Sequence, residues 1–160
     1  MKTRKTKKGD GGAKAAEFAP RDSAGYLVRD AHRAFQHLLE QRIAPYGVTR
    51  GQWYFLRVLW TEDGLSQREL SQRVGMMEPT TVIALQSMEK SGLVRRERSA
   101  KDKRKAQVWL TPKARKLKRR LLPVARHITM QSRHGVTQRE FQQFRDVIAR
   151  MTANLDRLRD

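Results

Sequence analysis

The sequence predicts a mainly α-helical chain with one β-hairpin. Apolar residues recur at spacings of three and four over most of the chain from Ser23 to Leu158, which is the period of amphipathic helices. Between Val94 and Leu110 this period gives way to two short runs typical of strands, with a polar loop between them. The chain has 160 residues and is 38% hydrophobic, enough to bury one core, which argues against a wholly disordered basic protein.

The charge indicates a polyanionic partner. Thirty-five Lys and Arg residues against 16 Asp and Glu residues give a net charge of +19. Residues 1–20 lack apolar periodicity and carry six basic and two acidic side chains, so we expect a disordered arm of net +4; the other 140 residues still carry +15. There is no Cys, no apolar run of membrane-spanning length and no apolar segment behind the first basic residues. We therefore expect a soluble cytoplasmic protein without disulfides.

Helix-start signals divide the first half of the chain. Residues 23–45 show helical periodicity that ends at Pro45. Thr49 with Gln52 three residues later is a capping box, and the run WYFLRVLW behind it is apolar on most sides, as in a helix at the centre of a small domain. Ser66 with Glu69 gives a second capping box, which begins a short third helix.

A tight turn separates this third helix from a fourth. Gly75-Met76-Met77 is expected to form the turn, and Pro79 fits the first position of a helix that runs to Gly92. Its inward stripe would be Thr81, Ala84, Leu85 and Met88.

The second half of the chain predicts a two-stranded ribbon and two long helices. Residues 94–98 and 106–110 read as strands joined by the basic loop 99–105. Thr111-Pro112 then starts a helix to about residue 133, in which we expect a kink at Pro123, and Thr137 with Glu140 caps a last helix. A helix-pairing seam of period near 3.5 runs along this last helix, made of Phe141, Phe144, Ile148, Met151, Leu155 and Leu158.

Two helices joined by a tight turn and followed by a basic hairpin predict a winged helix-turn-helix that binds DNA. The fourth helix would enter the major groove with the face opposite its inward stripe, which carries Thr80, Ile83, Gln86, Ser87 and Lys90. On this face Gln86 suits an adenine edge, Thr80 and Ile83 suit a thymine methyl, and Lys90 suits a phosphate. An ordinary solvated helix face is the alternative. The wing, residues 94–105, has seven basic and two acidic side chains, which suits phosphates and a narrow minor groove.

The order of these elements and several motifs resemble the multiple-antibiotic-resistance regulator (MarR) family of bacterial transcription factors, over residues 23–158. The motifs are Leu65-Ser66-Gln67-Arg68-Glu69-Leu70, residues 88–96 (MEKSGLVRR), and Asp102-x-Arg104 leading to Leu110-Thr111. The resemblance implies that Asp102 orders the wing and that Arg104 enters the minor groove. Together with the fourth-helix face, the expected DNA-binding residues are Ser66, Gln67, Arg96, Arg98, Lys101, Asp102, Lys103, Arg104 and Lys105. Family members often carry Arg or another polar residue where this chain has Ile83 and Ser87.

The resemblance also implies a division of the chain. After the arm at residues 1–20, residues 21–160 would form one domain, with a DNA-binding lobe at about 49–111. Helices at about 23–45 and 112–158 would build an obligate homodimer, in agreement with the seam of the last helix. The resemblance further implies that the protein is a repressor, located in the bacterial cytoplasm and associated with the nucleoid.

A small aromatic or phenolic anion is the effector that the resemblance implies. Candidate ligand-binding residues on the first two helices are His32, Arg33, Phe35, Trp53, Tyr54 and Arg57. Phe35, Trp53 and Tyr54 lie on stripes that would be core in any protein, and for these three a core role is the favoured interpretation. For His32 a structural histidine is favoured over a ligand-binding one. Six basic residues in the fifth helix, at 113–120, are either a solvated face or contacts to flanking phosphates.

Catalysis and metal binding find no support in the sequence. There is no Cys nucleophile, no Gly-x-Ser-x-Gly elbow and no phosphate-binding glycine loop, and the four His lack metal-ligand spacing. We expect no enzyme activity and no cofactor or metal. The favoured interpretation is a homodimeric repressor of a pseudo-palindromic double-stranded DNA operator, released by the effector and without a membrane partner. The alternatives are a ligand-independent regulator and a non-specific architectural nucleic-acid-binding protein.

Overall fold

The computed structural model describes residues 19–98 and 106–159. They divide after Ala34 into two compact units, whose described parts are residues 19–34 in the first and residues 35–98 and 106–159 in the second. The described part of the first unit contains a 3-10 turn, Pro20–Asp22, and the first half of α1, Ala24–Ile43. There Arg29 lies over the ring of Tyr26, and Arg33 pairs with Asp30 at 2.8 Å. Most of the expected arm lies outside the described residues.

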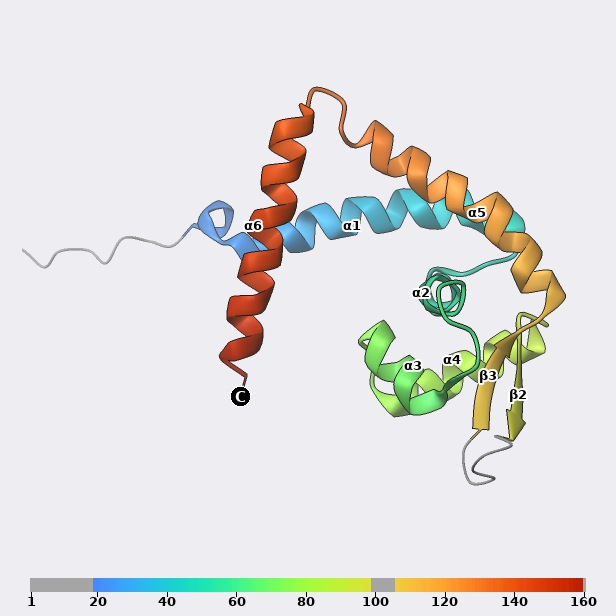
Figure 1. The fold of residues 1–160 in the computed structure, drawn as a ribbon. Coiled ribbons are helices and arrows are strands. Elements are labelled where there is room, and N and C mark those ends of the chain that lie inside the picture. Colours follow the sequence, from blue (N-terminus) through green and yellow to red (C-terminus); the bar gives the residue numbers. More distant parts are fainter. Residues whose placement is uncertain (1–18, 99–105, 160) are drawn as a thin grey trace, which may run out of the picture. The chain divides into compact units, whose positions relative to one another are not determined.

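The second unit confirms the predicted mainly helical fold with one hairpin (Figure 1). A 3-10 turn, Ala44–Tyr46, follows α1. The remaining elements are α2 (Arg50–Leu59), β1 (Leu65–Ser66), α3 (Gln67–Val74), α4 (Glu78–Lys90), β2 (Val94–Arg98), β3 (Ala106–Leu110), α5 (Pro112–Gln131) and α6 (Gln138–Arg157).

The helix starts lie where the capping signals predict them. Thr49, Ser66 and Thr137 each accept a hydrogen bond from the backbone N–H three residues later, and the Gln or Glu at that position bonds back to the cap. The start of α4 differs by one residue, because the helix begins at Glu78 and Pro79 takes its second position. Both positions lie in the first turn, where the missing N–H of proline has no helical acceptor to lose.

The sheet has three strands, so the prediction of a two-stranded ribbon is corrected. The order is β1-β3-β2 and both pairings are antiparallel, with Leu65 opposite Val108 and Val94 opposite Leu110. Two residues are too few to show strand alternation in a sequence. Ser66 is both the last residue of β1 and the N-cap of α3. It can be both because an N-cap residue has extended backbone angles, here φ −65° and ψ 156°.

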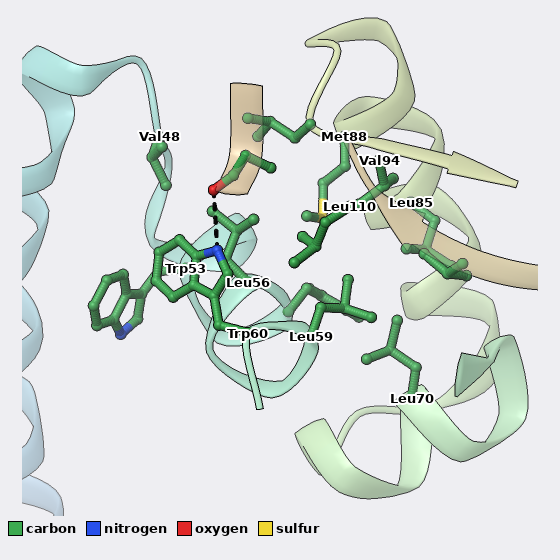
Figure 2. Close-up of a cluster of buried hydrophobic side chains, with 14 of the residues drawn as sticks. Val48, Trp53, Leu56, Leu59, Trp60, Leu70, Leu85, Met88, Val94 and Leu110 are labelled. Carbon is green, nitrogen blue, oxygen red and sulfur yellow. Dashed lines mark hydrogen bonds between the residues drawn. The ribbon is translucent and has the colours of Figure 1, made fainter. Parts of the chain in front are cut away.

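The core of the second unit gathers around α2. Phe55, Leu56 and Leu59 are at most 1% exposed and share one cluster with residues of α3, α4, the sheet and α5 (Figure 2). The indole N–H of Trp60 donates to the carbonyl of Ala114 at 3.0 Å, a bond drawn in Figure 2 that joins the end of α2 to α5. The helices α3 and α4 and the three strands therefore pack on one hydrophobic core, with α2 at its centre.

Within the described residues, none of the helices combines the length and the apolar character needed to cross a bilayer.

Candidate nucleic-acid interface

The fourth helix has two sharply different faces, as its sequence predicts. Thr81, Leu85 and Met88 are fully buried. The opposite face is exposed and presents the five residues expected to meet DNA, which are Thr80, Ile83, Gln86, Ser87 and Lys90. Because the inward stripe holds the helix against the core, its rotation about its own axis is set and the outer face is presented as one surface.

The turn between α3 and α4 is held by short-range contacts. Gly75 ends α3 with φ +73°, a left-handed conformation that glycine adopts without strain. The hydroxyl of Ser71 donates to the carbonyl of Met76 at 2.5 Å, which fastens α3 to the turn. Ser66 and Gln67 lie half-buried at the start of α3, and the Ser66 hydroxyl donates to Glu69 at 2.6 Å as part of the cap.

A buried amide links α2 to the exposed face of α4. The side chain of Gln52 is 5% exposed, and its Nε2 donates to the hydroxyls of Ser87 at 3.4 Å and Ser91 at 3.3 Å. Ser87 is thus an exposed residue whose hydroxyl also accepts a hydrogen bond from within the protein. The sequence marks Gln52 only as a capping residue, and periodicity contains no signal for this second contact.

Arg96, expected to meet DNA, is bound by a carboxylate of α4. Its Nε and Nη2 donate to Glu89 Oε2 at 2.9 and 2.5 Å, and both side chains are about 30% exposed. The hydrogen bonds from Arg96 hold the pKa of the Glu89 carboxyl below its usual range, against a smaller opposing effect of burial. The pair ties β2, the first strand of the wing, to α4.

The tip of the wing lies outside the described residues. Lys101, Asp102, Lys103, Arg104 and Lys105 belong to this segment, and Arg98 closes β2 opposite Ala106. The base of the wing is described, and it is held by Asp63. One carboxylate oxygen of Asp63 accepts from the N–H of Leu110 at 2.9 Å, and the other accepts from Arg115 at 2.9 Å. Asp63 therefore joins the end of α2, the strand β3 and the start of α5.

Half of the basic side chains in the run at 113–120 of α5 make contacts within the protein. Lys113 donates to the carbonyl of Ser91 and Lys118 to that of Trp60, each at 2.8 Å, and these two residues are the C-caps of α4 and α2. A cation suits the partial negative charge of a helix C-terminus. With the Arg115 contact to Asp63, three of the six basic side chains fasten α5 to the lobe, a role that neither sequence interpretation included. The five residues of β3 span about 17 Å, which is the length of chain between the tip of the wing and the start of α5.

Known proteins share this arrangement. A family model described as MarR family matches residues 46–105. The HTH-type transcriptional regulator TtmR of Methylorubrum extorquens (strain PA1) is 37% identical over 93 residues, which are 58% of this chain and 48% of that protein, so the chain spans about half the length of this curated relative. A MarR transcriptional regulator from Methanosarcina mazei Go1 has a solved structure similar to 84% of this chain and 96% of its own, with 29% identity and a TM-score of 0.77. The chain belongs to the MarR family of transcriptional regulators.

A DNA complex also has the MarR fold seen here. The Staphylococcus aureus MepR–DNA complex is similar over 82% of this chain and 98% of its own, with a TM-score of 0.77. Its sequence is 21% identical to this one, so the likeness concerns the fold alone.

In this MarR-family chain the six candidate effector residues lie in different surroundings. His32 and Arg33 belong to the first unit, and the other four belong to the second. Trp53 is 5% exposed and packs edge-on against Trp60, so it is a core residue, whereas Phe35 is 43% exposed. The guanidinium of Arg57 lies 5.7 Å from the ring centre of Trp53.

Tyr54 carries a polar group that connects α2 to α1. Its phenol oxygen accepts a hydrogen bond from the side-chain amide of Gln36. Burial raises the pKa of Tyr54, and the positive charge of Arg50 opposes this in part. Tyr54 therefore remains a neutral phenol at physiological pH.

The seam expected on the last helix of this MarR-family chain is largely uncovered. Phe144, Leu155 and Leu158 are 59%, 61% and 83% exposed, whereas Phe141, Ile148 and Met151 are half-buried. Arg133 lies over the ring of Phe141, 4.1 Å from its centre. In the part of the chain that the structure describes, no three His, Asp or Glu side chains are grouped as a metal site would require.

Proposed function

We propose that the chain is a sequence-specific DNA-binding regulator that acts as a homodimeric repressor. The observation that carries this proposal is the division of α4, whose inward side chains are fully buried while its outer face is exposed. The basic sequence of the wing that follows α4 supports it. A helix held in this way fits the major groove, which is about 12 Å wide. MepR, which has the same fold, has been solved with DNA.

The two parts of the lobe would divide the work of binding. On α4, Gln86 would pair with an adenine edge, Thr80 and Ile83 would contact base edges, and Lys90 would contact a phosphate. Residues 99–105, with Arg104 as the reaching side chain and Asp102 to order it, would enter the adjoining minor groove. Arg96 would act through Glu89, by holding the wing at its angle to α4.

Dimerisation would place two such lobes on successive major grooves, about 34–36 Å apart on a pseudo-palindrome. Helices at about 23–45 and 112–158 would form the dimer, and residues 49–111 the lobe. Support comes from the uncovered seam of α6, because Phe144, Leu155 and Leu158 expose more apolar surface than a lone helix in water favours. Leu155→Glu should give monomers in size-exclusion chromatography with light scattering, whereas Asn154→Glu, an exposed neighbour off the seam, should leave dimers.

An aromatic or phenolic acid would control release from DNA. The ligand would favour a lobe spacing that no longer matches the operator, and it can do so only through its difference in affinity for the two spacings. In the second unit, the Tyr54 hydroxyl and the Arg57 cation beside Trp53 are groups that suit such an acid. Screening aromatic acids for thermal stabilisation, followed by DNA release, tests this; stabilisation by none of them would favour a ligand-independent regulator.

Footprinting tests DNA recognition itself. DNA upstream of the chain's own gene should show one protected palindrome that survives excess random DNA, and Gln86→Ala should cost about 1–3 kcal/mol at particular bases only. Arg104→Ala should weaken binding to every sequence. Uniform binding without a footprint would instead indicate the non-specific architectural protein that a net charge of +19 also permits.

A further inference from the structure

A buried amide lies directly behind part of the exposed face of α4. The side chain of Gln52 is 5% exposed and reaches from the first turn of α2 to the C-terminal end of α4. Its Nε2 lies 3.4 Å from the hydroxyl oxygen of Ser87 and 3.3 Å from that of Ser91. Ser87 is exposed, whereas Ser91 is half-buried. A group below the surface therefore contacts one of the residues expected to meet DNA.

A backbone group fixes the orientation of this amide. The N–H of Thr49 lies 3.1 Å from Gln52 Oε1, and a backbone N–H can only donate. The amide oxygen must therefore face Thr49, so the NH₂ group with its two hydrogens faces the serines. Since an amide nitrogen only donates, both hydroxyls accept from it.

The two serines differ in the use of their own hydrogens. Ser91 Oγ donates to the backbone carbonyl of Ser87 at 2.8 Å, so its hydrogen is used at the end of α4. Among the hydrogen bonds of the described residues, none has the Ser87 hydroxyl as its donor. Because a lone pair of this hydroxyl faces Gln52, its hydrogen is directed to the exposed side, where it can meet an acceptor.

A phosphate oxygen is the acceptor that this position favours. Base edges are contacted by the N-terminal part of a recognition helix, whereas Ser87 lies in the third turn of α4. Lys90, three residues later, is exposed on the same face and suits a phosphate. A serine hydroxyl is also a common phosphate donor, so Ser87 and Lys90 together offer hydrogens to one stretch of the DNA backbone.

We propose that Gln52 is a positioning residue for DNA binding, which turns the hydrogen of the Ser87 hydroxyl toward a DNA phosphate beside Lys90. This rests on the proposed function and gives a part in it to a buried residue of α2. Ser87 makes the contact, and Gln52 sets its polarity. Because a DNA phosphate oxygen only accepts, the contact is lost when the hydroxyl turns its hydrogen inward.

Exchanging the amide for a carboxylate reverses this polarity. Glu also completes a capping box, so Gln52→Glu keeps the acceptor for the N–H of Thr49 and the start of α2. The oxygen that replaces Nε2 only accepts, so Ser87 then donates inward. Binding of the full chain to the footprinted operator, followed by fluorescence anisotropy, should weaken about tenfold, as it should in Ser87→Ala. In the Ser87→Ala background, Gln52→Glu should change the affinity less than about twofold.

Two further variants separate polarity from structure and charge. Ser91→Ala is the matched control, because Ser91 accepts from the same amide while its hydrogen stays within the protein. It should lower the Tm and leave operator affinity within about twofold of the parent. Gln52→Met removes the donor without adding a charge, so the Ser87 hydroxyl rotates freely and binding should weaken about threefold. Circular dichroism checks that each variant keeps its helices.

The salt dependence and modified DNA identify the acceptor. A hydroxyl releases no counterion, so Ser87→Ala and Gln52→Glu should leave the slope of log K against log salt concentration unchanged. Lys90→Ala should instead reduce that slope by about 1 for each half-site. Replacing single phosphates of the half-site by neutral methylphosphonates should abolish the effect of Ser87→Ala at one position.

Absence of any specific footprint would overturn both the proposed function and the role of Gln52. With a specific footprint, four results would overturn only the role of Gln52. Either exchange of Gln52 could have the same effect with and without Ser87, which would show that it acts through charge or helix position. Ser87→Ala could bind like the parent, or the loss in Gln52→Glu could shrink as salt is raised. A loss confined to one base pair and insensitive to methylphosphonates would identify a base acceptor instead of a phosphate.

Discussion

Replacing Glu89 by Gln removes the carboxylate that binds the Arg96 guanidinium, and with it the link between α4 and β2, the first strand of the wing. Replacing Arg96 by Gln removes the same link from the other side. Either change should lower the free energy of unfolding, and the double variant should lose little more than one single variant does. The coupling free energy between the two positions is the quantity to measure.

The size of this coupling follows from the geometry of the pair. Exposed ion pairs contribute about 0.2–1 kcal/mol. Here two N–H groups of one guanidinium, at 2.9 and 2.5 Å, bind a single carboxylate oxygen, and both side chains are only about 30% exposed. We expect a coupling at the upper end of that range, about 1 kcal/mol at neutral pH. In a domain of this size each single change should lower the Tm by about 2–4 °C.

The pH dependence of the coupling has a definite sign. The pKa of Glu89 is lowered in the folded protein, chiefly by the hydrogen bonds from Arg96. The stabilisation is therefore complete above the ordinary Glu pKa of about 4.3 and is lost as the pH falls through the lower folded value. The coupling should be constant from pH 8 to pH 5 and should shrink below about pH 4.

Urea denaturation of the parent, the two single variants and the double variant measures the coupling. All four are compared at one protein concentration, because the stability of a dimer depends on it. Arg95 and Glu97 form a matched control on the same strand, an ion pair whose side chains are about 50% exposed. Their coupling should be near zero. A value for Glu89 and Arg96 below about 0.3 kcal/mol, or one unchanged at pH 3, would refute the reasoning.

DNA binding by the same variants separates positioning from direct contact. If Arg96 positions the wing through Glu89, both Glu89→Gln and Arg96→Gln should weaken operator binding. If Arg96 instead binds a phosphate, Glu89→Gln releases the guanidinium and should strengthen binding, while Arg96→Gln weakens it.

Three other substitutions test single contacts of the lobe. Lys118→Met removes the donor to the C-cap carbonyl of α2 and should cost about 1 kcal/mol in urea denaturation, whereas Lys116→Met, an exposed neighbour, should stay within about 0.5 kcal/mol of the parent. Thr81→Val replaces a fully buried hydroxyl for which the described residues offer no hydrogen-bond partner, and should raise the free energy of unfolding by about 1 kcal/mol; a lower urea midpoint would contradict this. Gly64→Ala puts a methyl group 2.5 Å from the ring of Trp109 at φ +77°, and should cost at least about 2 kcal/mol in a fluorescence-monitored melt; an unchanged Tm would argue against that packing.

Local sequence signals predicted most of the second unit. The capping boxes at Thr49, Ser66 and Thr137 place three helix starts correctly, and the spacing of Thr81, Leu85 and Met88 identifies the buried face of α4. These signals are readable because they depend on residues within one or two turns of each other. Once the buried face of α4 is identified, its exposed face is the opposite one.

The sequence by itself thus determined the helices, the hairpin, the family and the side of α4 that faces outward. Only the tertiary structure decided the partners of the charged groups: Arg96 binds Glu89, Asp63 joins β3 to α5, and Lys118 caps α2. It also added β1 to the sheet. The Asp63 and Lys118 contacts join residues about fifty positions apart, and a charged side chain satisfies local rules equally well in water, on DNA or against a carbonyl. Which of these it meets depends on how the helices pack on α2, and that is a property of the core as a whole.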